Sequence, residues 1–244
     1  MGYADVILAD SPVAYWRTSE SPGATTATDS SGNGRNATYV GGYTLGAAGA
    51  IASEVNGAVS LNGSSGYLNA GDDDAFDGMA ALSVEAWIRP SNPTAAYGMV
   101  LAKTPADYST AYELRFYIAT GRLEFILSGS VVTPDAIGAT VLVADQWYHV
   151  VGTYNGTTAN LYLNGVLDGT DTKAADAVRA LAEPLAIGCR RISVTPELFF
   201  SGRIDEVAIY SAALSAAQVR RHYHAAKTLG FSNRLLRGRL VGSA

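Results

Sequence analysis

Short runs in which apolar and polar residues alternate recur along this chain, and turns rich in Gly, Asn, Asp and Ser separate them. Residues 82–89 and 112–118 alternate with a period of two, which is typical of strands with one buried face. Residues 147–154 and 159–163 flank an Asn155-Gly156 turn, and Asn-Gly readily adopts the positive φ angles of a tight hairpin. Because such strands follow one another with little helical periodicity among them, the sequence predicts an all-β fold: a two-sheet antiparallel β-sandwich.

Length and composition agree with a single domain of this kind. Sandwiches often fill 244 residues as one unit, and 48% apolar with 16% charged residues is typical of a globular chain. The single cysteine, Cys189, cannot form an internal disulfide, so we expect the fold to depend on packing, with or without a bound metal. We expect neither a secretion signal nor membrane insertion, because the N-terminal segment lacks a basic and an apolar region and no apolar run reaches the length of a membrane span.

Charge is divided unevenly along the chain. Six of the 17 basic residues lie in residues 220–244, which contain no acid, so residues 1–219 have 11 basic against 22 acidic residues and a formal charge of −11. Binding to a nucleic-acid backbone depends on Lys and Arg replacing condensed counterions. We therefore expect no nucleic-acid partner.

One helix is predicted near the C-terminus. Ser215 is a good N-cap with Gln218 as its capping-box partner, and the helix is expected over residues 216–226, with Gly230 beyond its end. We assign residues 1–230 to the domain and residues 231–244 to a tail. The tail has five large apolar residues interleaved with arginines, so it is predicted to anchor the protein to a neighbouring subunit; folding back onto the acidic body is the alternative.

Four segments together resemble the LamG-like or concanavalin A-like jelly roll, in the bacterial and phage form of the laminin G family. They occur in the family's order: Ala14-Tyr15-Trp16-Arg17 followed by Asp29 to Gly34, residues 82–90, residues 147–165, and Ile204 to Tyr210 leading into Leu214-Ser215. The resemblance covers about residues 3–227 and implies two stacked sheets, one of them concave. The opening segment ADVILADSPVAYWR also looks like LamG-like structural proteins of phages that infect high-GC Gram-positive hosts.

Catalysis is not expected. Related glucan-cleaving enzymes carry Glu-x-Asp-x-(x)-Glu on one strand, and this chain has no such motif. Asp205 and Glu206 are adjacent on a predicted strand and should point to opposite faces, so they cannot act as the pair of carboxylates that glycoside hydrolysis needs. His149 is predicted to be a packed strand residue, and His222 and His224, two apart on a helix, make a poor zinc pair.

Carbohydrate binding needs exposed aromatic rings beside planar hydrogen-bonding groups. Glu85, Trp87, Glu113, Arg115 and Tyr117 lie off the inward alternation and are predicted to line the concave sheet; packing is the alternative explanation for each aromatic residue. The further candidates are Tyr97, Tyr108 and Tyr162.

The resemblance also implies a structural Ca²⁺ on the convex side. Asp29, Asn33, Gly34 and Asp205 match the family's calcium-binding positions in this chain. Oxygen ligands from a loop and a distant strand would connect the two ends of the domain. The alternative is that Asp29 and Asn33 shape a turn while Asp205 accepts backbone donors.

We therefore predict a non-enzymatic virion protein of a phage tail or capsid surface that recognises host-surface glycans. Its partners would be a glycan and, through the tail, other virion subunits or further copies of itself. The first alternative is a carbohydrate-binding module or lectin of a bacterial extracellular protein, located outside the cell or on its surface. The second is a purely structural decoration protein without a ligand.

Overall fold

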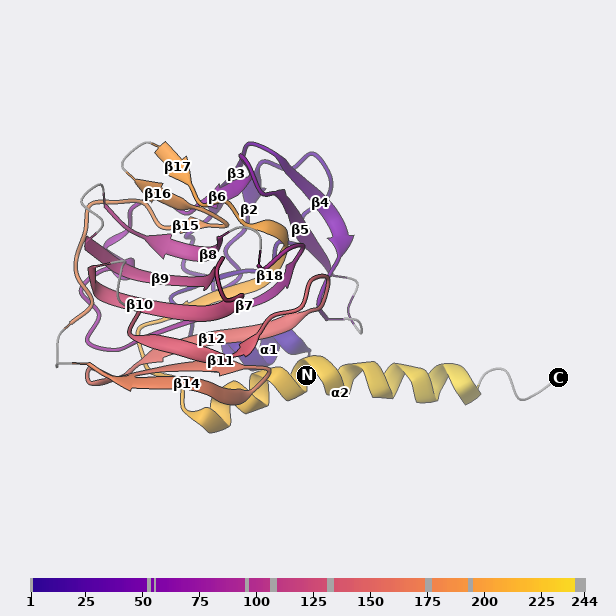
Figure 1. The fold of residues 1–244 in the computed structure, drawn as a ribbon. Helices are drawn as coiled ribbons and strands as arrows, with labels where there is room; N and C mark the ends of the chain where they lie inside the picture. The colour runs from indigo at the N-terminus through magenta and orange to yellow at the C-terminus, as the bar shows by residue number, and fades with distance from the viewer. Residues whose placement is uncertain are drawn as a thin grey trace.

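Two antiparallel sheets stacked face to face make up the body of the protein, which confirms the predicted β-sandwich (Figure 1). The computed structural model describes residues 2–51, 54, 56–94, 97–105, 109–130, 134–173, 177–192 and 195–239, with the backbone alone for 109, 128–130, 192 and 228–239. Within these residues, every strand pair in the two sheets is antiparallel.

The first sheet has the strand order β14-β13-β12-β7-β18-β5-β4, and β1 also pairs with β18. In chain order its strands are β1 (Ala14–Trp16), β4 (Tyr43–Ala48), β5 (Gly57–Asn62), β7 (Leu82–Pro90), β12 (Tyr148–Tyr154), β13 (Thr158–Leu163), β14 (Val166–Thr172) and β18 (Ser201–Tyr210). The hairpin predicted at Asn155-Gly156 joins β12 to β13 and is confirmed.

The second sheet has the order β11-β10-β9-β8-β15-β6-β3-β2. Its strands are β2 (Thr26–Ala27), β3 (Ala37–Val40), β6 (Tyr67–Asn69), β8 (Gly98–Lys103), β9 (Ser109–Tyr117), β10 (Arg122–Ser130), β11 (Ala136–Val141) and β15 (Ala186–Ile187). Strands β16 (Arg190–Ile192) and β17 (Thr195–Glu197) form a separate short hairpin, in which β16 contacts β8 of the second sheet. In the chain, the 3-10 helix η1 (Asp74–Phe76) lies between β6 and β7.

Two helices lie side by side on the outer face of the first sheet: α1 (Tyr3–Leu8) and α2 (Ala216–Arg239) (Figure 1). The predicted capping box is confirmed, because the Ser215 backbone N–H donates to Gln218 Oε1 at 2.9 Å. The predicted helix end near residue 226 is wrong, since α2 continues through Gly230. One glycine inside a helix costs only about 1 kcal/mol, and no proline follows it. Position 230 therefore lies inside α2, and the division into domain and tail stays a prediction.

The helices create a second apolar cluster outside the sandwich core. The core between the sheets includes Val84, Ala86 and Ile88 of β7, whereas Trp87 of the same strand packs beneath α1 and α2. Since β7 is central in its sheet and covered on both sides, almost all of its side chains are buried. No helix among the described residues is long and apolar enough to cross a membrane.

Candidate functional site

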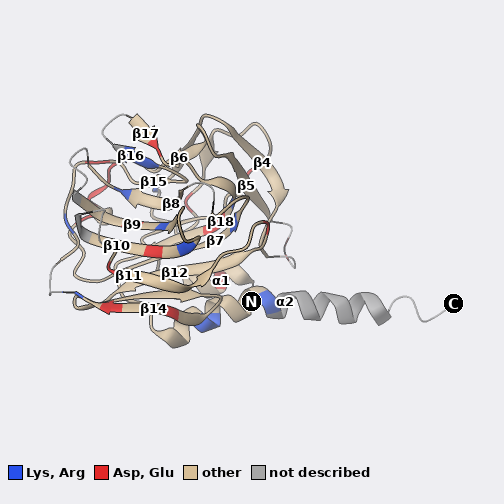
Figure 2. Cartoon of the chain, viewed as in Figure 1, with Lys and Arg blue, Asp and Glu red and all other residues tan. Residues whose placement is uncertain are grey.

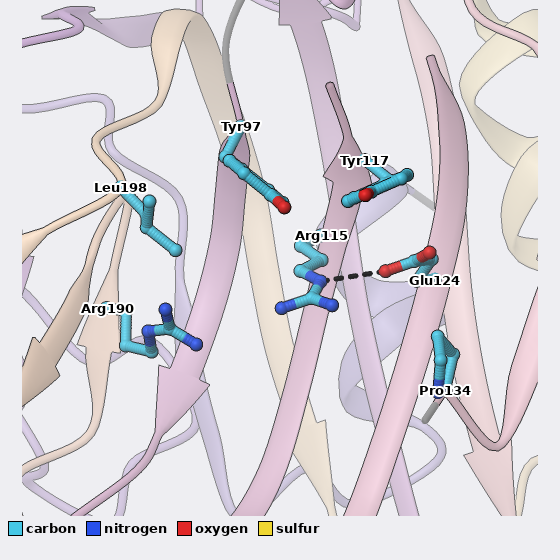
Figure 3. A pocket seen from close by; sticks show the side chains of 7 residues that line it. All are labelled: Tyr97, Arg115, Tyr117, Glu124, Pro134, Arg190 and Leu198. Carbon is cyan, nitrogen blue, oxygen red and sulfur yellow. Dashed lines mark hydrogen bonds and ion pairs between the residues drawn. The ribbon is translucent and has the colours of Figure 1, made fainter. Parts of the chain in front are cut away.

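A pocket of about 420 Å³ opens on the outer face of the second sheet, the face turned away from α1 and α2 (Figure 3). Its lining side chains come from β9, β10, β16 and the segments beside β8, β11 and β17: Tyr97, Arg115, Tyr117, Glu124, Pro134, Arg190 and Leu198. Apolar and aromatic walls with a few fixed polar groups are typical of small-ligand sites.

The alternation of β9 aims its polar side chains at this pocket. Leu114 and Phe116 pack in the core between the sheets. Because successive side chains of a strand point to opposite faces, Glu113, Arg115 and Tyr117 point outward. These three of the five predicted carbohydrate-binding residues therefore share one face, as the sequence predicts.

Arg115 forms the floor of the pocket and is held by two carboxylates. Glu124 lies opposite Arg115 in the register of β9 and β10, and the Arg115 Nε–H donates to Glu124 Oε2 at 2.8 Å. The Arg115 Nη1–H donates to Glu113 Oε2 at 3.3 Å. Figure 2 shows an acidic and a basic residue on β10 itself, Glu124 and Arg122; the arginine that pairs with Glu124 is Arg115 of the neighbouring strand β9. Charged side chains paired in this way keep their orientation without a ligand.

Glu113 joins the two arginines of the site. Its carboxylate lies 3.6 Å from Arg190 Nη1 and accepts a hydrogen bond from Thr104 Oγ1 at 2.7 Å. Burial raises the pKa of Glu113, although the two guanidiniums and Thr104 oppose this shift. Arg190 also donates to Glu197 of β17 through Nε and Nη2, at 2.9 Å each.

Tyr97 and Tyr117 form an aromatic corner at the rim of the pocket. Their ring centroids are 5.2 Å apart with the planes inclined at 62°, and the Arg115 guanidinium lies 5.7 Å from the Tyr97 centroid. Both rings are only half-buried. A sugar could stack its C–H groups on an aromatic face here while its hydroxyls reach Arg115 and Glu124.

The other two predicted carbohydrate-binding residues, Glu85 and Trp87, do not belong to this site, so that part of the prediction is wrong. Both are fully buried on β7 of the first sheet, beneath the helices. Their outward alternation was identified correctly, but the face to which they point carries α1 and α2.

Glu85 is the centre of a buried ionic network. Its carboxylate accepts hydrogen bonds from His149 Nε2 at 2.6 Å, His222 Nδ1 at 2.9 Å and the Tyr210 hydroxyl at 3.0 Å. Burial raises the pKa of Glu85, but the two histidines together lower it by more, so the net pKa lies below the ordinary value. The prediction that His149 is a packed, hydrogen-bonded strand residue is confirmed.

His222 lies between two carboxylates. Its Nδ1 contacts Glu85, and its Nε2 lies 2.7 Å from Asp10 Oδ2. Since ionised carboxylates only accept hydrogen bonds, both ring nitrogens must carry protons, and His222 is a cation. Burial lowers the pKa of His222, whereas Glu85 and Asp10 raise it, and the net shift is upward. The network thus connects α2 to β7 and to the segment that follows α1.

Trp87 serves as packing surface for the two helices. Its indole Nε1–H donates to the Tyr3 hydroxyl at 2.9 Å. The ring stacks on Tyr223 of α2 at 5.9 Å between centroids, and Lys227 Nζ lies 5.3 Å from the indole centroid. These contacts fill the ring face that a sugar would need.

The remaining aromatic candidates divide among different places. Tyr97 lines the pocket, Tyr162 is buried on the first sheet, and Tyr108 lies outside the described residues. Sequence reasoning missed Arg190 and Leu198, which reach the pocket from the β16–β17 hairpin. No local pattern marks them, because their role depends on where that hairpin packs.

Asp29, the first predicted calcium ligand, accepts hydrogen bonds at both carboxylate oxygens. Oδ1 accepts the backbone N–H groups of Tyr15 and Ser31, both at 2.9 Å. Oδ2 accepts the Ser31 hydroxyl at 2.8 Å and the Arg35 backbone N–H at 2.9 Å. Burial raises the pKa of Asp29, but these donors lower it below its ordinary value. The side chain therefore shapes the turn.

The other predicted calcium ligands lie in separate arrangements. Asn33 Nδ2 donates to the Val13 carbonyl at 2.9 Å, Gly34 has a left-handed φ of 77°, and Asp205 accepts the Ala50 N–H at 2.8 Å. Asp29 and Asp205 share no hydrogen-bonding partner, and the described residues include no group of three or more His, Cys, Asp or Glu placed to hold a metal. Asp29, Asn33 and Asp205 already have hydrogen-bonding partners within the protein, and calcium binding stays a prediction.

Asp205 and Glu206 do not point to opposite faces, so that prediction is wrong. A bulge interrupts the β18–β7 register after Asp205, and Glu206 adopts a φ of 52°. Both carboxylates therefore meet Asn56 Nδ2, at 3.5 Å and 2.5 Å. Both are buried, and burial raises the pKa of Glu206 to about 7 although Arg17 lowers it. Burial and the neighbouring Glu206 charge also raise the pKa of Asp205.

Several solved structures share this fold. Domain 4 of AbnA, an extracellular GH43 arabinanase from Geobacillus stearothermophilus solved with arabinotriose, is 22% identical with a TM-score of 0.64, over 87% of this chain and 98% of that one. A Trypanosoma rangeli sialidase solved with sialic acid is 13% identical with a TM-score of 0.67, over 90% of this chain and 33% of the sialidase. The receptor-binding domain of the botulinum neurotoxin C/D mosaic serotype is 16% identical with a TM-score of 0.63, over 88% of this chain and 51% of that one.

At these identities the likeness shows the fold alone. No curated protein sequence matches the chain at a significant level. Residues 62–220, well over half of the chain, match the Laminin_G_3 family. They extend from the end of β5 into α2 and so include both strands that form the floor of the pocket. The chain therefore belongs to the concanavalin A-like lectin/glucanases superfamily.

Proposed function

We propose that the protein binds carbohydrate in the pocket on the outer face of the second sheet. The observation that carries this proposal is the aromatic corner of Tyr97 and Tyr117 beside the ion pair of Arg115 and Glu124. Sugars present apolar C–H faces and hydroxyls that both donate and accept, and this corner offers a partner for each. The arabinotriose complex of the AbnA domain supports the proposal by showing a sugar ligand with a similar fold.

We propose binding without hydrolysis. Cleavage of a glycosidic bond needs two carboxylates on either side of it. Among the described side chains that line the pocket, Glu124 is the one carboxylate; Glu113 lies fully buried beside Arg115. The protein is expected to release no reducing sugar from β-glucans; release that Glu124→Gln abolishes would contradict this proposal.

The test of binding is a glycan array followed by calorimetry on any glycan that binds. Tyr117→Ala and Tyr97→Ala are each expected to weaken binding about tenfold or more, because a lost stacking contact of about 1.4 kcal/mol is a factor of ten. Trp87→Phe is the matched aromatic control and should lower stability without changing affinity. Unchanged affinity in both tyrosine variants, or loss of affinity in the tryptophan variant, would locate the glycan elsewhere.

The wider role is a further proposal. We propose a place on the surface of a phage particle, which is supported by the resemblance of the opening segment to phage structural proteins. A carbohydrate-binding module of a bacterial extracellular protein is equally compatible with the fold and the pocket. A purely structural protein without a ligand is the third possibility, and the absence of any glycan ligand on the array would favour it.

A further inference from the structure

We infer that the pocket selects uncharged sugars and discriminates against sugars that carry a carboxylate. This inference rests on the proposed function, which it deepens by naming the class of ligand. The observation behind it is that carboxylates of the protein itself already pair with both guanidiniums of the site.

Each arginine contacts two acids. Arg115 donates to Glu124 at 2.8 Å and to Glu113 at 3.3 Å. Arg190 donates to Glu197 at 2.9 Å and lies 3.6 Å from Glu113. The cluster therefore contains two positive charges and three carboxylates.

The charge balance does not favour an anion in either protonation state of Glu113. With Glu113 ionised, the cluster has a net charge of −1. Burial raises the pKa of this carboxyl, and with Glu113 protonated the cluster is neutral. In neither state is a positive charge left to balance an incoming carboxylate, whose desolvation would then remain uncompensated.

The hydrogen-bonding groups of the pocket also favour a neutral sugar over a charged one. Glu124 is an acceptor that lines the pocket beside the donor Arg115. A hydroxyl can donate to Glu124 and accept from Arg115 at once, whereas an ionised carboxylate can only accept. A sugar carboxylate in this corner would therefore face Glu124 without a proton to share.

The negative charge of residues 1–219 adds to this discrimination, and the full chain is also negative, with a formal charge of −5. Residues 1–219 have a formal charge of −11, from 11 basic and 22 acidic residues. A surface of that sign lowers the local concentration of polyanionic polysaccharides, and salt weakens the effect.

The test uses pairs of ligands that differ only at C6, where a hydroxymethyl group is replaced by a carboxylate: 1,4-linked trisaccharides of glucose, galactose and mannose, each with its C6-oxidised uronic acid form. Affinities of the full-length protein are measured by calorimetry at pH 7 and 0.15 M NaCl. In every pair that binds, the neutral trisaccharide should bind at least about tenfold more tightly than its uronate.

Variants separate charge from shape. Glu197→Gln removes one acid from Arg190 outside the pocket lining and should reduce the neutral-to-uronate ratio about three- to tenfold. Asp171→Asn, an exposed acid on β14 of the other sheet, is the matched control and should leave the ratio unchanged. A ratio that Glu197→Gln does not move would overturn the charge argument.

Two outcomes distinguish this inference from the proposed carbohydrate binding on which it rests. Uronates that bind as tightly as their neutral partners, or more tightly, would overturn the inference and leave carbohydrate binding intact. The absence of binding by both members of every pair would overturn the proposed function and the inference with it.

Discussion

Replacing Glu85 by alanine should undock α2 from the sandwich. The carboxylate accepts hydrogen bonds from His149, His222 and Tyr210, which lie on β12, α2 and β18. All four side chains are buried. After Glu85→Ala, three buried donors lose their acceptor, and the His222 cation keeps Asp10 as its remaining counter-ion.

The magnitude follows from the burial of the network. Removing one partner of a buried ion pair costs about 3–5 kcal/mol, because the other charge stays buried without compensation. That is a large part of the roughly 5–15 kcal/mol by which a typical domain is stable. For a chain of this size, about 2–4 °C of Tm per kcal/mol gives an expected fall of about 6–20 °C.

Urea denaturation and amide hydrogen exchange measure this effect. Protection should fall most over residues 216–227, because the network holds that half of α2 to β7. Glu85→Gln keeps the side-chain shape and one acceptor oxygen, so it should lose less stability than the alanine variant. Asp171→Ala is the control for removal of one negative charge at an exposed position.

A loss of less than about 1 kcal/mol in Glu85→Ala would contradict this reasoning, since that is the size expected for an exposed ion pair. A large loss that is spread evenly over both sheets, with α2 protected as before, would show that Glu85 stabilises the sandwich and not the docking of the helix.

Four further predictions concern pH, calcium and the C-terminus. The raised pKa of His222 means that its contribution to stability is complete below its unfolded value of about 6.5 and is lost as the pH rises through the folded value, so His222→Gln should flatten Tm measured from pH 5 to 9. Glu206, with its pKa raised to about 7, stabilises the fold below its unfolded pKa of about 4.3 and loses that contribution as the pH rises through 7; Glu206→Gln should make Tm less pH-dependent over that range, and an unchanged slope would refute this. Calcium bound through Asp205 at a hundredfold excess over Kd would add about 2.7 kcal/mol, so chelator should lower Tm in the wild type but not in Asp205→Ala, and identical wild-type melting curves would sink the idea. Truncation after Gly230 should leave the monomer Tm unchanged while abolishing oligomers or incorporation into particles, both measured by sedimentation; a large fall in Tm with assembly intact would favour a tail folded back on the domain.

The sequence by itself was enough to predict the regularly alternating strands β7 and β9 and their faces, because a period of two has the same meaning wherever a strand is packed. Val84 and Ile88 alternate with Glu85 and Trp87, and the structure preserves that division. The hairpin at Asn155-Gly156 and the helix start at Ser215 were also predictable, since turn and capping chemistry act over a few residues.

Only the tertiary structure decided what covers each face. Trp87 and Tyr117 both alternate outward from a strand, yet α2 buries Trp87 while Tyr117 stays at a pocket. Alternation distinguishes two faces but does not say which of them receives a helix. That depends on contacts between residues far apart in the chain, such as the pair of Glu85 and His222.

Contacts between residues far apart in the chain also explain why the sequence did not predict the bulge in β18 or the pocket. Local pattern predicted that Asp205 and Glu206 diverge, whereas a register shift against β7 brings both to Asn56. Arg190 reaches Glu113 because β16 of the short hairpin contacts β8, and no spacing in the sequence encodes that approach. Local chemistry determined the alternating strands, the hairpin turn and the start of α2; the site depended on long-range packing, whose geometry is a property of the whole chain.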